Sequence, residues 1–92
     1  MSGLQAPGEL SAKGNSGAVN HVEFSASADG SSYEIWRRHG DTVDWYLHAT
    51  VSEPMFDDQG VKPGQYYEYK VRAVRESEVS EFSPSAVAYG AE

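Results

Sequence analysis

The chain has 92 residues, with 7 Lys and Arg against 14 Asp and Glu, which gives a formal net charge of −7. This length allows one small hydrophobic core, and the acidic balance argues against nucleic acid and membrane surfaces as partners, because both need a basic patch. The sequence has no cysteine, which excludes disulfide bonds, thiolate zinc sites and cysteine nucleophiles.

Apolar residues alternate with polar ones at a period of two, and no stretch shows the spacing of an amphipathic helix. In the first half of the chain this alternation predicts strands at residues 4–13, 22–26, 33–36 and 45–51. The first is expected at a sheet edge, because Pro7 cannot donate to a ladder. Turn-forming residues separate the strands at 14–17, 27–32 and 39–41.

The second half contains the clearest strand of the chain. Residues 67–73 alternate between an apolar row that begins with Tyr67 and a charged row that begins with Glu68. A short apolar piece at 55–56 and the acidic turn 57–60 precede it, and a last strand at 79–89 follows, notched by Pro84. Seven short strands at this spacing are typical of an all-β sandwich.

Residues 61–74, with the sequence VKPGQYYEYKVRAV, resemble the E–F corner and the following strand of fibronectin type III domains. The resemblance extends over about residues 7–89 and includes Tyr33 to Arg37, Phe56 with Asp58, and the Ser-Pro-Ser at 83–85. It implies one domain over residues 1–92 with a seven-stranded antiparallel immunoglobulin-like sandwich.

The resemblance also implies a structural role for Tyr67, whose hydroxyl is expected to bond to backbone a few residues upstream. Phe24 stands where the family usually has a core Trp. The predicted core consists of Phe24, Tyr33, Ile35, Leu47, Phe56, Tyr69 and Val71.

The polar residues give no pattern that points to catalysis. No Gly-x-Ser-x-Gly turn is present, and His21, His39 and His48 are read as solvated strand or turn residues. The acidic pair Asp57-Asp58 lacks the oxygen ligands of a calcium loop and is read as turn chemistry. We therefore expect no enzymatic activity, no catalytic residue, no metal and no cofactor.

The aromatic residues of the central strands form the candidate binding surface. Because Tyr33 and Ile35 face the core, Trp36 is expected to face outward, and a hairpin would bring it opposite Trp45 or Tyr46. The candidate surface comprises Trp36, Trp45, Tyr46, Lys70 and Arg72. Such a surface suits sugar stacking or a protein hot spot, but cation–π packing that only stabilises the sheet is the simpler reading.

The resemblance implies a non-catalytic spacer or interaction module of a larger bacterial extracellular or phage structural protein. Its partners would then be neighbouring domains of the parent chain. It would act outside the cell, at the cell surface or in a phage particle. A carbohydrate-binding module that takes a polysaccharide, a protein-docking domain and a small stand-alone protein remain as alternatives.

Overall fold

The computed structural model describes residues 4–27, 30–40 and 44–91. These residues form eight strands in two sheets, and no helix among them could cross a membrane. The strands are β1 Gly8–Asn15, β2 Val19–Ser25, β3 Ser32–His39, β4 Tyr46–Val51, β5 Met55–Gln59, β6 Tyr66–Arg75, β7 Glu78–Val79 and β8 Ala86–Tyr89.

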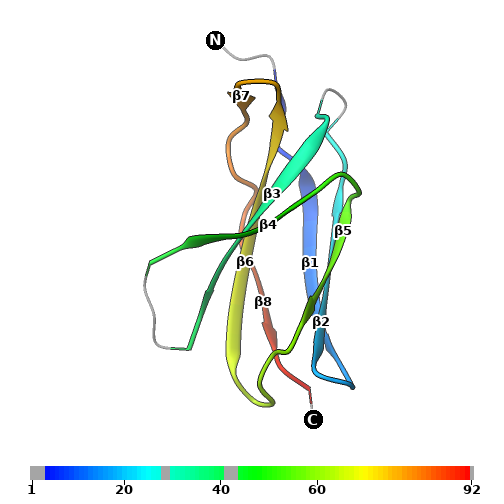
Figure 1. The fold of residues 1–92 in the computed structure, drawn as a ribbon, viewed down its shortest axis with the longest axis vertical. Helices are drawn as coiled ribbons and strands as arrows, with labels where there is room; N and C mark the ends of the chain where they lie inside the picture. The colour runs from blue at the N-terminus through cyan, green and yellow to red at the C-terminus, as the bar shows by residue number, and fades with distance from the viewer. Residues whose placement is uncertain (1–3, 28–29, 41–43, 92) are drawn as a thin grey trace.

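The two sheets pack face to face as a sandwich (Figure 1). One sheet has the order β1-β2-β5, and the other has the order β4-β3-β6-β7 with β8 also paired to β6. All pairings between named strands are antiparallel. The all-β class and the fibronectin type III arrangement are those that the alternation and the resemblance predict.

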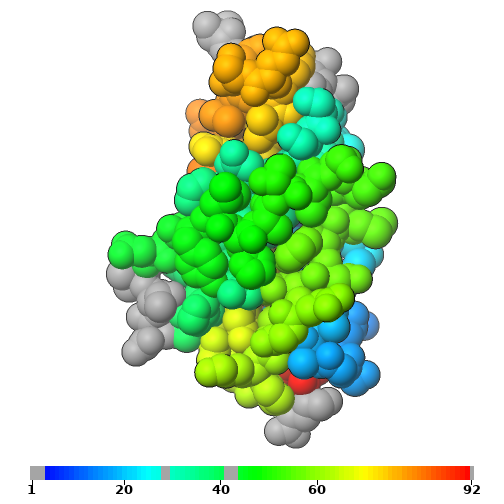
Figure 2. All heavy atoms as spheres, viewed as in Figure 1, coloured from blue at the N-terminus to red at the C-terminus, as the bar shows by residue number. Residues whose placement is uncertain are grey.

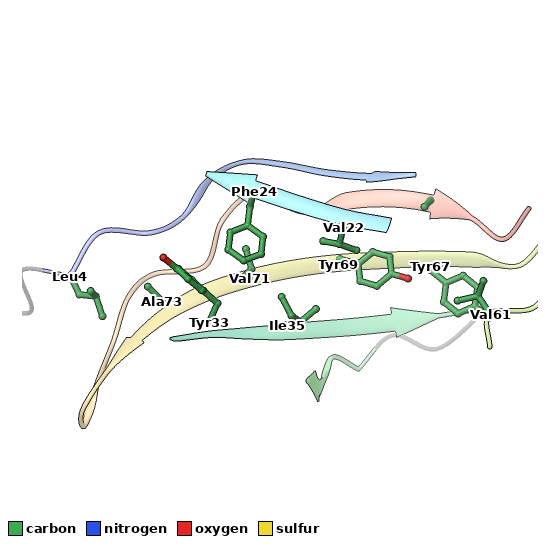
Figure 3. Packing of buried hydrophobic residues seen from close by; sticks show 11 residues of the cluster. Leu4, Val22, Phe24, Tyr33, Ile35, Val61, Tyr67, Tyr69, Val71 and Ala73 are labelled. Atoms are coloured by element: carbon green, nitrogen blue, oxygen red, sulfur yellow. The ribbon is translucent and has the colours of Figure 1, made fainter. Parts of the chain in front are cut away.

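The core forms between the inward rows of β2, β3 and β6 (Figure 3). β6 contributes Tyr67, Tyr69, Val71 and Ala73 to it. Because side chains alternate across a strand, this row is apolar while the opposite row of β6 is charged. Phe24 occupies the centre and meets the Tyr33 ring edge to face at 4.9 Å.

Tyr67 closes the core at the corner before β6. Its hydroxyl accepts a hydrogen bond from the backbone N–H of Lys62 at 2.8 Å, five residues upstream. Tyr67 is only 3% exposed, so this bond gives the hydroxyl of a buried side chain a partner.

Eight strands form where seven are predicted, because the segment at 79–89 is interrupted. Ser80 and Ser83 there take the place of regular ladder residues: their N–H groups donate to Ala73 and Val71 of β6, and their hydroxyls accept from the N–H groups of the same two residues. Pro84 has no N–H to continue the ladder.

Two predicted turns, at 14–17 and 57–60, are partly strand, and the first of them is a turn only from residue 16 on. β1 continues through Asn15, and Gly14 is needed for a close approach, since a Cβ there would lie 2.2 Å from the Tyr89 carbonyl oxygen. β5 includes Asp57 and Asp58, because Asp58 faces inward and binds partners from the other sheet. The predicted loops at 27–32 and 39–41 fall partly outside the described residues.

Leu47 is wrongly predicted as core, since its side chain is 47% exposed. The cause is a bulge between β3 and β4: Ile35 pairs with Ala49, but Trp36 pairs with Leu47, so His48 has no partner across the ladder. The same bulge places Leu47 opposite Trp36, where Trp45 or Tyr46 was expected.

Replacing Tyr67 with Phe should lower the free energy of unfolding by about 1–3 kcal/mol, because the hydrogen bond between the Lys62 N–H and the Tyr67 hydroxyl is lost. Urea denaturation measures the change. Tyr89→Phe is the matched control, since Tyr89 is 60% exposed, and should change stability by less than about 0.5 kcal/mol. Equal midpoints for the two variants would contradict the structural role of Tyr67.

Candidate functional site

The outward face of the five-stranded sheet gathers aromatic rings and cations from β3, β6 and the segments beside them. We call it the aromatic–cation face, and it consists of Trp36, Trp45, Phe82, Arg38, Lys70 and Arg72. Trp36 and Lys70 are direct neighbours in the ladder between β3 and β6. The outward direction of Trp36 follows from the burial of Ile35 before it.

Rings and cations contact one another in turn across this face. The Lys70 ammonium lies 4.5 Å from the ring centre of Trp45 and 4.1 Å from that of Phe82. The Arg72 guanidinium lies 4.8 Å from Phe82 and 5.4 Å from Trp36. Phe82 and Trp36 meet edge to face at 5.7 Å. Contacts of this kind contribute roughly 0.5–1 kcal/mol each at exposed sites.

Two carboxylates pair with the two arginines of the face. Glu34 accepts from the Trp36 indole at 3.0 Å and from Arg72 at 2.7 Å. Burial opposes its charge, but these two bonds lower the pKa of Glu34. Glu68 accepts from Arg38 at 2.8 Å, and its pKa is also lowered, against the effect of burial, by its hydrogen bonds.

Four of the five predicted surface residues meet here, and Tyr46 does not. Tyr46 pairs with Arg37 in the ladder, and its hydroxyl accepts from the Arg37 guanidinium at 2.6 Å, away from the aromatic–cation face. The sequence does not predict Phe82 as part of this face. Phe82 lies in the interrupted segment between β7 and β8, where no alternation indicates on which side of the sheet a side chain lies. Its only sequence signal is an aromatic residue close to Pro84.

A polar cluster lies between the two sheets and is centred on Asp58, which is 1% exposed. Its carboxylate accepts from Arg37 of β3 at 2.6 Å and from Tyr69 of β6 at 2.6 Å, and lies 2.9 Å from the His48 ring of β4. Asn20 of β2 donates to the Tyr69 hydroxyl at 3.0 Å. Figure 2 shows atoms of β4 and β5, in green, across the middle of the near side of the molecule.

The arrangement of this cluster suits a structural clamp. Both carboxylate oxygens of Asp58 are engaged. Burial and the bond to Asp58 raise the pKa of Tyr69, so its hydroxyl stays protonated and cannot serve as a nucleophile. Burial opposes the charge of Arg37, but its bonds to Asp58 and Tyr46 raise its pKa. Within the described ranges, no group of three or more His, Asp or Glu side chains is placed to hold a metal ion.

His21 lies in a second, exposed cluster on the outward face of the three-stranded sheet. Its ring nitrogens lie 2.5 Å from the Asp57 carboxylate and 2.6 Å from the Glu23 carboxylate. Both nitrogens can donate only in the imidazolium form. The bonds to Asp57 and Glu23 accordingly raise the pKa of His21. Of the predicted solvated strand or turn positions, His21 takes a partly exposed strand position in β2, whereas His48 in β4 is partly buried against Asp58.

No protein-family model matches the sequence, and no curated protein matches it. Solved structures match its fold. A Fn3-like protein from Clostridium thermocellum is 26% identical, with a TM-score of 0.85 over 99% of this chain and 97% of that chain. The crystal structure of FN3tt is 17% identical, with a TM-score of 0.84 over 99% and 98% of the two chains. A structure of titin kinase and its flanking domains is 13% identical, with a TM-score of 0.77 over 89% of this chain and 16% of that chain.

Replacing Asp58 with Asn should lower the free energy of unfolding by about 3 kcal/mol, because the half-buried Arg37 loses its counter-charge. Chemical denaturation measures the loss. Asp57→Asn is the control in the same strand, with a side chain 57% exposed, and should cost less than about 1 kcal/mol. A loss no larger than that of the control would contradict the clamp.

The His21 contacts predict a pH-dependent contribution to stability. Because the pKa of His21 is raised in the folded state, its contribution is complete below the unfolded value of 6.5 and disappears as pH rises through the folded-state pKa. The stability difference between the wild type and His21→Gln should therefore be larger near about pH 5.5 than near about pH 8.5. An NMR titration of the ring gives the pKa directly, and a value at or below 6.5 would contradict the assignment.

Proposed function

The chain has the fibronectin type III fold, and from it we propose that the protein acts as a non-catalytic spacer that joins other domains end to end. Domains of this fold are in general non-catalytic modules of larger proteins. The match to titin kinase and its flanking domains, of which this chain covers 16%, illustrates that setting.

The observation that carries the proposal is the path of the chain. The blue segment that leads into β1 comes from one end of the long axis, and the red segment that follows β8 leaves at the other end (Figure 1). The molecule measures 42 × 24 × 18 Å along its principal axes. A domain with this path adds most of its length to a chain of domains, and a net charge of −7 disfavours nonspecific contact between neighbours.

For the parent protein we propose an extracellular, cell-surface or phage-particle setting, which rests on the resemblance of the sequence to bacterial and phage modules. A role in binding neutral polysaccharide receives less support from the geometry. Sugar stacking uses the flat face of an aromatic ring, whereas the rings of Trp36 and Trp45 contact the cations of Arg72, Arg38 and Lys70.

Two copies of the chain joined head to tail by a short linker test the spacer role. Small-angle scattering should give a largest dimension of about twice the 42 Å length of one domain. A tandem with a long Gly/Ser linker is the control, because its two copies should sample many separations. A compact particle from the short-linker tandem, with the copies side by side, would contradict the spacer role.

A further inference from the structure

The aromatic–cation face differs in charge from the rest of the molecule. It holds three of the 7 Lys and Arg in a chain whose formal net charge is −7. Arg38 pairs with Glu68 at 2.8 Å, and Arg72 pairs with Glu34 at 2.7 Å. Lys70 forms no ion pair with any residue that the structure describes.

Lys70 lies at the centre of this face with no ion-pair partner among the described residues, and the charge of Glu68, which already pairs with Arg38, acts on it less than the charges of Arg38 and Arg72 do. The rings of Trp45 and Phe82 flank its ammonium, and Arg38 and Arg72 are close enough to repel it. Partial burial and this repulsion lower the pKa of Lys70. A carboxylate brought to this position would relieve the repulsion and would be attracted by all three cations.

Exposed apolar side chains extend the face on both sides of Lys70. Leu47 of β4 lies opposite Trp36 and is 47% exposed, while Val87 of β8 lies opposite Glu68 and is 43% exposed. Tyr89 packs against Tyr66 at 5.8 Å. A protein surface covers such a row of separate apolar groups better than a sugar chain does, because sugars need open ring faces.

We propose that the aromatic–cation face binds an acidic segment of a partner protein, with an Asp or Glu carboxylate on Lys70 and apolar neighbours against Leu47 and Val87. The charge of the face selects this occupant. A second copy docked through the same face would place Lys70 and the two arginines near their own counterparts, where like charges repel. The inference goes beyond the spacer role and does not depend on it.

The two tryptophans of the chain are the probe, since both lie on this face. Synthetic peptides with Glu between Leu residues, and without Trp or Tyr, should change the Trp fluorescence at low salt. The same peptides with Gln in place of Glu should bind at least about fivefold more weakly, because the charge-assisted bond is lost.

Lys70→Gln should weaken binding of the Glu peptides by at least about fivefold, whereas Lys70→Arg should retain most of it. Lys13→Gln removes the same charge from β1 in the other sheet and should change binding by less than about twofold. Thermal denaturation of each variant checks that the fold survives. A loss of binding by a folded variant is then due to the change in the aromatic–cation face.

Four results would overturn the proposal. The first is equal binding of Glu and Gln peptides, and the second is unchanged binding by Lys70→Gln. The third is tighter binding of alginate, a polyuronate, than of any peptide, which would assign the face to an anionic polysaccharide. Sedimentation that shows self-association lost in Lys70→Gln would likewise replace the acidic partner with a second copy. None of these results alters the dimensions of the tandem, so the spacer role is judged separately.

Discussion

The buried carboxylate of Asp58 holds the two sheets in one arrangement. A charge that is 1% exposed is tolerated only with donors around it, and here the donors come from three strands of the opposite sheet. Apolar packing between sheets has little directional preference, whereas these hydrogen bonds work only at one separation and one register. The clamp therefore specifies how β5 faces β3, β4 and β6.

The bulge between β3 and β4 connects this clamp to the outer surface. By leaving His48 without a ladder partner, it allows His48 to reach Asp58 while Leu47 faces outward beside Trp36. One extra residue thus serves the interior and the surface together. A strand without the bulge would pair His48 with Trp36 and Leu47 with Arg37, which would turn His48 outward and Leu47 inward.

The sequence predicts the regular parts of this molecule well. Alternation and the 61–74 segment predict the all-β sandwich, and four residues of the aromatic–cation face follow from outward positions on neighbouring strands. The errors have two physical causes. A period of two cannot reveal a bulge, so Leu47 is wrongly predicted as core, and the choice between Trp45 and Tyr46 stays open in the sequence. The acidic segment at 57–60 contains Gly60 and is typical of a turn. The contacts of Asp58 join residues that lie far apart in the sequence, so no local pattern predicts the clamp.

The path of the chain determines how the domain would carry tension. A pull on both ends acts along the long axis, parallel to β1 and β8, so it loads the β1–β2 and β6–β8 ladders in shear (Figure 1). In that geometry several hydrogen bonds resist together, whereas a peeling force would break them singly. β8 is the shorter of the two terminal strands, at 4 residues against 8 in β1. Once β8 has detached, the segment before it, in which Ser80 and Ser83 bond to β6, would carry the load. The domain would therefore give way under tension in two successive steps.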